Sequence, residues 1–358
     1  MAAPIHKPLL VALLVVLWTP PLLARGPQRL ARLTEPDLGT WAQSLDRLLQ
    51  HPSLAPGRPS HDSAAARTRY LDNVTKSFAE RGARPCRDGR VWSDVVDIWE
   101  RLRPIIRDTY GVDMPVRVQL LAGGGVTAAA RALPDGSVLL HRNDVEYCRS
   151  VARAVAAAGT DRAALLRNLA TVARSTQQGK CRVTFGRTDR RLYRAALEGA
   201  LVSLLGHEMS HYAAAHPMLT YSTQPRALRD EAELASRLKR YFPARTRRAC
   251  SLDDVVQGRP LLIAQAQEAD ADRAAVDLAV AARVSADGLM AELVVQAMLG
   301  GLREQPVGSH PPGLYRLDDS RSRLRKHGLT SLADDVTRRD LAVALREARR
   351  GLIVLSPR

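Results

Sequence analysis

Apolar residues recur every three or four positions over much of the chain, which is the spacing of one face of an α-helix. The longest such stretch runs from Arg190 to Ala215; Asp189 is suited to cap its start, and Pro217 is suited to end it. Pro260 is suited to open another helix. The pattern predicts helices at residues 40–50, 63–82, 91–110, 190–215, 260–273, 286–302 and 337–350.

A short region before the longest helix has the alternation that is typical of β-strands. The alternating runs are residues 115–121, 126–133 and 137–141. Gly123–Gly125 and Pro134–Gly136 separate them as turns. We therefore predict a mostly helical α+β protein with a small β-sheet beside the long helix.

Residues 1–24 have the composition of a secretory signal peptide. The basic start ends at Lys7, an apolar run extends from Leu9 to Trp18, and Ala24 offers a small residue for cleavage. The apolar run is too short to span a bilayer comfortably. We predict an exported protein, either periplasmic or secreted. The alternative is that the segment stays uncleaved and anchors the chain in the membrane.

Four cysteines lie in the part of the chain that would be exported: Cys86, Cys148, Cys181 and Cys250. An even number of cysteines in an oxidising compartment suggests two disulfides, for which three pairings are possible. Cys148 and Cys181 flank a stretch rich in Ala and Arg that looks like an insertion near residues 149–187, so we expect this pair, with Cys86 and Cys250 as the other. A zinc–cysteine site fits less well, because no two cysteines have the close spacing that such sites use.

The chain is strongly basic, with 53 Lys and Arg against 37 Asp and Glu and a net charge of +16. Such a surface favours anionic neighbours, among them an anionic membrane surface or acidic proteins. Nucleic acid is not expected as a partner. Aromatic residues make up only 4% of the chain, no known DNA- or RNA-binding motif is present, and the protein is predicted to be exported.

Within the long helix, the residues from His207 to His211 have the pattern His-Glu-x-x-His. Two residues four positions apart share one helix face, so both imidazoles can point at one metal ion with Glu208 beside them. Two imidazoles and an adjacent carboxylate are typical of a hydrolytic zinc site, in which the carboxylate acts as the base.

The next predicted helix carries two carboxylates on one face, Glu268 and Asp272. Either of them can complete a zinc site that has two imidazoles. The other can accept the N–H of a ligating imidazole and fix its tautomer. Without the histidine motif, the same carboxylates would be interpreted as an ordinary solvated helix face.

Together these motifs resemble the M48 peptidases, a gluzincin family that includes the CAAX prenyl proteases and the HtpX-type membrane proteases. The family has His-Glu-x-x-His on one helix and Glu-x-x-Ala-Asp on a later one, here Glu268 to Asp272. The resemblance implies zinc ligation by His207, His211 and Glu268. It also implies that Glu208 is the catalytic base and that Asp272 supports the ligands from behind.

Two further segments extend the resemblance. Residues 309–316 are similar to the family's His-Pro-Pro segment, so His310 and Arg316 become candidates to stabilise the oxyanion. The predicted sheet is similar to the family's sheet, whose edge strand pairs with an extended substrate. The family's Asn-Ala pair on that strand falls at Thr127-Ala128, so the sequence departs from the family there.

The resemblance covers about residues 90–330 and implies a peptidase domain there. With the patterns outside it, we predict a signal peptide at 1–24, a helical lead-in at 25–89, the peptidase domain at 90–330, and a C-terminal helix and tail at 331–358. We expect one Zn²⁺ per chain and a zinc metalloendopeptidase that cleaves exported or envelope proteins, with a role in protein quality control. The alternative is a latent or inactive relative that binds unfolded proteins as a chaperone. A zinc hydrolase of non-peptide amides fits less well, since the strand segment suits polypeptides. The sequence does not indicate an oligomeric state.

Overall fold

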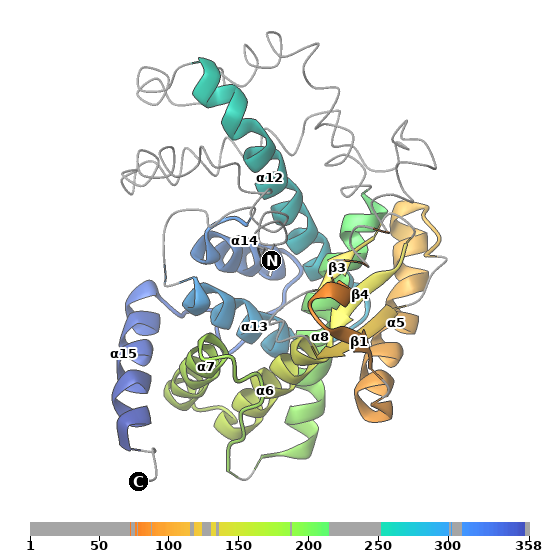
Figure 1. Cartoon of the computed structure of the whole chain (residues 1–358). Helices are drawn as coiled ribbons and strands as arrows, with labels where there is room; N and C mark the ends of the chain where they lie inside the picture. The colour runs from red at the N-terminus through yellow and green to blue at the C-terminus, as the bar shows by residue number, and fades with distance from the viewer. Residues whose placement is uncertain are drawn as a thin grey trace, which may run out of the picture.

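The computed structural model describes residues 72, 76, 78–86, 88–114, 118–123, 130–133, 136–186, 188–214, 252–300, 302 and 310–354, without the side chains of 252–266 and 350–354. The predicted signal peptide, the predicted helix at 40–50 and the Thr127-Ala128 pair lie outside these residues. Within them, the prediction of a mostly helical α+β protein with a small sheet is confirmed (Figure 1).

The sheet has four strands in the order β1-β2-β4-β3, of which β2 and β4 are parallel and the other neighbours are antiparallel. The strands are β1 (Ala83–Pro85), β2 (Val118–Gly123), β3 (Arg131–Ala132) and β4 (Val138–His141). Three of them match the predicted strands, whereas β1 was not predicted, because three residues are too few to show alternation. Val138 and Leu140 on β4 join the main core, while Leu139 packs with Phe78 on the opposite face of the sheet.

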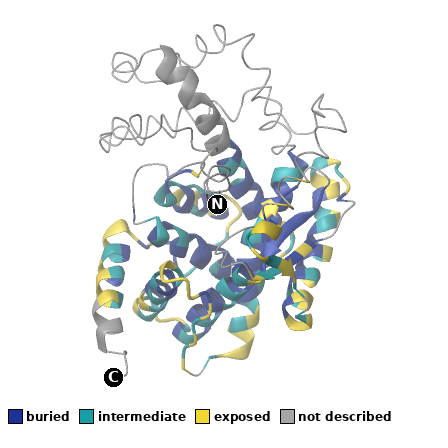
Figure 2. Ribbon diagram, viewed as in Figure 1, coloured by how far each residue is buried: buried dark blue, intermediate teal, exposed yellow. Residues whose placement is uncertain are grey.

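Eight labelled helices make up most of the described chain, and three of them, α5, α6 and α8, pack against the sheet. The helices are α5 (Gly89–Tyr110), α6 (Arg142–Ala158), α7 (Arg162–Gln177), α8 (Arg190–Ala213), α12 (Leu252–Ala281), α13 (Ala286–Leu299), α14 (Gly313–Lys326) and α15 (Arg338–Val354). Helix α8 is central and packs against α5, α6, α12 and α13 (Figure 1). Its burial is correspondingly high over the last three turns (Figure 2). Asp189 caps α8 as predicted, since its Oδ1 accepts the backbone N–H of Leu192 at 2.9 Å.

Two glycines allow α8 and α13 to approach closely. A Cβ on Gly199 would lie 2.4 Å from the carbonyl oxygen of Ser285, and one on Gly288 would lie 2.0 Å from that of Ala196. Real Cβ atoms do not tolerate such distances, so the crossing depends on the missing side chains. This contact fixes the position of α13 relative to the helix that carries the histidine motif.

Gly288→Ala is therefore expected to destabilise the fold, although alanine has the higher helix propensity. The backbone atom that the new methyl group would meet cannot move aside, and overpacking of this kind costs about 1–3 kcal/mol or more. A urea midpoint well below that of the wild type would agree with this expectation. Gly300→Ala is the matched control, because the nearest atoms to its Cβ would be 3.6 Å away.

The predicted Cys148–Cys181 disulfide is wrong. Cys86, Cys148 and Cys181 are free thiols, and Cys250 lies outside the described residues. The thiol of Cys148 points at α8, 3.7 Å from the carbonyl oxygen of Ala200. The Cys181 carbonyl instead accepts the hydroxyl of Ser150 at 2.8 Å. Cys148 and Ser150 are two positions apart on α6, which corresponds to a rotation of about 200° around the helix axis. The thiol of Cys148 and the backbone of Cys181 therefore lie on different sides of α6.

The start of α12 and the segment near 149–187 both differ from their predicted form. Pro260 does not open its helix, since α12 begins eight residues earlier at Leu252. The proposed insertion near 149–187 contains most of α6 and all of α7, and both helices contribute residues to the main core. Among the described helices, none combines the length and the apolar composition that crossing a bilayer requires.

Candidate metal centre

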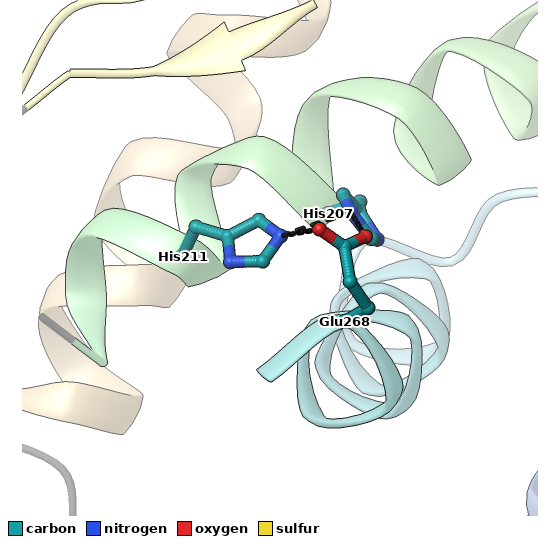
Figure 3. Close-up of side chains that lie close together, drawn as sticks. All are labelled: His207, His211 and Glu268. Carbon is teal, nitrogen blue, oxygen red and sulfur yellow. Dashed lines mark hydrogen bonds and ion pairs between the residues drawn. The ribbon is translucent and has the colours of Figure 1, made fainter. Parts of the chain in front are cut away.

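Helices α8 and α12 bring three metal-ligating side chains together: His207, His211 and Glu268 (Figure 3). The Nε2 atoms of the two histidines are 3.0 Å apart. Glu268 places Oε2 3.1 Å from Nε2 of His207 and Oε1 3.6 Å from Nε2 of His211. Glu268 is 57 positions from the nearer histidine, His211, so the fold brings the third side chain of the cluster from a distant part of the sequence.

The close packing of α12 on α8 positions this cluster. Gly206 precedes the first histidine, and a Cβ there would lie 3.5 Å from the Cα of Ala275 and 3.4 Å from the side chain of Leu278. Ala275 and Leu278 are themselves buried. A single methyl group would just fit at these distances, whereas a side chain larger than alanine would push α12 away at the turn that carries His207, so the small residue at 206 helps the carboxylate of Glu268 to reach the imidazoles.

The three side chains fit a zinc ion. Ligand atoms about 2.1 Å from a tetrahedral zinc lie about 3.4 Å from one another, and the contacts within the cluster range from 3.0 to 3.6 Å. In addition, Oε2 of Glu268 is buried and accepts no well-directed hydrogen bond within the described residues, although ring nitrogens of His207 and His310 lie 3.1 and 3.2 Å from it. A buried carboxylate oxygen without a well-directed donor is costly, and a cation held between it and the imidazoles would remove that cost.

Asp272 meets the other ring nitrogen of His207. The distance from Oδ1 to Nδ1 is 2.9 Å, and both residues are buried. An ionised carboxylate only accepts hydrogen bonds, so Nδ1 of His207 carries the proton and donates it, which leaves Nε2 facing Glu268 and His211. Burial disfavours a charged imidazole, but the hydrogen bonds to Asp272 and Glu268 outweigh it and raise the pKa of His207 to about 10. The surroundings of His207 thus attract positive charge.

Arg316 lies behind Asp272 and not beside the metal ligands. Its Nε and Nη2 donate to the two carboxylate oxygens of Asp272, each at 2.6 Å. Burial of Asp272 opposes ionisation, yet the charge of Arg316 and the hydrogen bond from His207 hold the pKa of Asp272 well below its usual value. The role of Arg316 as an oxyanion stabiliser stays a prediction; in the structure its guanidinium is bonded to Asp272, on the Nδ1 side of His207.

His310 lies on the same side of the cluster as Glu268. Its Nε2 is 3.2 Å from Oε2 of Glu268, and about half of its side chain is exposed. Of the two residues expected to stabilise an oxyanion, His310 is the one whose ring reaches the open side of the cluster. Its backbone forms an isolated β-bridge just before the Pro311-Pro312 pair that precedes α14.

The carboxylate of Glu208 points at the sheet. Its Oε2 accepts the backbone N–H of Ala132 at 2.7 Å. Ala132 is on β3, which is the last strand of the sheet and pairs with β4 on its other side. This contact was not predicted, since a backbone donor leaves no trace in the sequence. This hydrogen bond holds the Glu208 carboxylate between the histidine cluster and the edge strand β3.

Two further residues of the site were missed, Glu292 and Gln296 on α13. They continue the hydrogen-bonded chain from Arg316, as described below. The signal that could have found Glu292 is a single ionisable residue within the apolar run from Leu289 to Leu299.

Comparison with known proteins gives one result. Residues 188–324 match the model of Peptidase family M48. The matched stretch begins at the cap of α8, ends in α14, and contains every residue of the cluster and its supports. It supports an M48-type peptidase and the metal dependence of that family. No curated protein and no solved structure matches the chain.

Proposed function

We propose that the protein is a zinc-dependent metalloendopeptidase whose metal ligands are His207, His211 and Glu268. The observation that carries the proposal is the cluster of two imidazoles and one carboxylate with a second carboxylate, Glu208, on the same helix. The match to family M48 supports it independently. A bound zinc ion would act as a Lewis acid and would lower the pKa of a coordinated water.

Four residues around the cluster have the remaining roles in catalysis and in positioning the ligands. Glu208 takes a proton from the attacking water and passes it to the leaving amine, as a general base and then a general acid. His310 donates a hydrogen bond to the carbonyl oxygen as negative charge develops on it. Asp272 and Arg316 hold His207 in the tautomer that leaves Nε2 available for ligation.

The edge strand β3 suits an extended polypeptide as the substrate. The sheet ends there in the described part of the chain, and the backbone of Ala132 already touches Glu208. A peptide added to this edge would lie beside the base, and main-chain hydrogen bonds would hold it with little dependence on its sequence. Unfolded proteins fit this description better than a single folded partner.

We also propose the cellular location in which the enzyme acts. The N-terminal segment favours an exported enzyme acting on periplasmic, envelope or secreted proteins, and the net charge of +16 favours work near an anionic membrane surface. The alternative is that the protein is a latent or inactive relative of the M48 peptidases, which binds unfolded proteins without cleaving them.

Incubation of the purified protein with an unfolded protein such as reduced casein separates these possibilities. We expect new peptide termini, detected by mass spectrometry, which disappear with a zinc chelator and return when zinc is added back. Binding of casein without new termini at any zinc concentration would favour the chaperone-like alternative. Cleavage that persists unchanged in the chelator would exclude the metal-dependent mechanism.

A further inference from the structure

A chain of hydrogen bonds begins and ends on α8 and passes through three other helices, so that one turn of α8 closes it into a ring. The ring runs through Ser203, Glu292, Gln296, Arg316, Asp272 and His207. Its first and last members are one helical turn apart on α8. Five of the six residues are buried, and Gln296 is half-buried.

We call these six residues the polar ring, and their hydrogen-bond donors and acceptors can be assigned in only one way. Arg316 has donors alone, so Gln296 must present its amide oxygen to it, which turns the amide NH₂ toward Glu292. Glu292 accepts that NH₂ at Oε1, accepts the hydroxyl of Ser203 at Oε2 (3.0 Å), and also accepts the hydroxyl of Tyr147 at Oε1 (3.4 Å). Arg316 and the carboxylate of Glu292 thus fix the orientation of the Gln296 amide from its two sides.

We infer that Glu292 is a positioning residue for the metal centre, which it influences through Gln296, Arg316 and Asp272. This inference rests on the proposed function for its link to zinc. Without an acceptor at position 292, the NH₂ of Gln296 loses its partner, the amide is held from the Arg316 side alone, and its oxygen is held less firmly against Arg316. Asp272 is then held less firmly against Nδ1 of His207. Loss of an outer-shell partner typically costs 10–100-fold in metal affinity.

The alternative role for Glu292 is purely structural. A buried carboxylate with only 1% of the residue exposed can be replaced by an apolar side chain at little cost, provided that its partners are also satisfied. Burial raises the pKa of Glu292, so it disfavours the ionised carboxylate. If Glu292 positions the metal centre, its replacement lowers zinc affinity more than stability. If its role is purely structural, its replacement changes stability and leaves zinc affinity unchanged.

Two variants of Glu292 test this difference. Glu292→Met keeps the volume but accepts no hydrogen bond from Gln296, and we expect zinc affinity, measured by competition with a chromophoric chelator, to fall about 10-fold. Glu292→Gln is the conservative variant. Its amide oxygen can accept from Gln296 while its NH₂ donates to Ser203, whose hydroxyl can rotate, so we expect a zinc Kd within about twofold of wild type.

A matched control on the same helix is Val294→Ala. Val294 is fully buried and lies outside the polar ring, so this variant should lower the melting temperature and leave zinc affinity unchanged. The double variant Glu292→Met/Gln296→Leu should bind zinc as weakly as Gln296→Leu alone, because both act through one path. Equal loss of zinc affinity in Glu292→Met and Val294→Ala, or additive losses in the double variant, would overturn the inference.

A readout on the zinc-free protein separates this inference from the proposed function. In ¹⁵N-histidine-labelled protein, the Nδ1–H of His207 should give a slowly exchanging proton signal in wild type and Glu292→Gln. It should exchange faster with water in Glu292→Met. If wild type bound no zinc but showed this pattern, the proposed function would fail while the ring remained. An unchanged signal in Glu292→Met would show that the ring does not hold His207.

Discussion

Replacing Glu208 by Gln is expected to lower the kcat of casein cleavage by about 10³–10⁴-fold, which is the upper range for general acid–base catalysis. The glutamine has almost the same shape and can still accept the N–H of Ala132 through its amide oxygen, so the fold should persist. It cannot accept a proton from water at pH 7. Zinc affinity should stay close to that of the wild type, because Glu208 is not one of the three clustered ligands.

Glu198→Gln is the matched control for this experiment. Glu198 is on the same helix, and its carboxylate pairs with Arg101 and Arg194 near the surface. Such partly solvated pairs contribute little, so kcat should change by no more than about twofold. If Glu208→Gln cleaved casein at a rate similar to Glu198→Gln, Glu208 would not be the base.

Arg316→Met is expected to lower the free energy of unfolding by about 3–5 kcal/mol, because it leaves a buried carboxylate without its cation. Arg316 makes both of its short contacts with Asp272 inside the protein, where no water can replace them. Urea unfolding monitored by circular dichroism measures the effect. A chelator should be present throughout, so that loss of zinc does not add to the difference.

The chain offers a close control two turns along the same helix. Arg323 on α14 pairs with Asp277 on α12, but both side chains are about one-third exposed, at 36% and 35%. Partly solvated pairs of this kind contribute about 0–1 kcal/mol. Arg323→Met should therefore cost much less than Arg316→Met. Similar costs for the two variants would show that burial does not set the strength of the inner pair.

The sequence predicted the parts of this site that depend on local spacing. The helix position of His207 and His211 follows from the four-residue interval, and the cap at Asp189 follows from its side chain. The sequence also limited the third ligand to one of two carboxylates on a second helix. What it could not supply was the packing of α12 on α8, because that depends on how Gly206, Ala275 and Leu278 fit together.

Other features were invisible or misleading for physical reasons. The contact between Glu208 and the Ala132 N–H involves a backbone atom that every residue except proline has. The cysteine pairing was wrong because an even count gives no information on direction, and Cys148 faces α8. Glu292 and Gln296 lie on a helix that is otherwise apolar, and their importance appears only when Arg316 is placed next to them.

The central claim is that two helices converge to hold one zinc ion, and the zinc content of the purified protein tests it most directly. After dialysis against metal-free buffer, elemental analysis should find one zinc per wild-type chain and almost none in His211→Ala. His327→Ala, which removes an exposed histidine that contacts Asp277, should keep one zinc per chain. A wild-type protein without zinc, or a His211→Ala variant that retains it, would contradict the account.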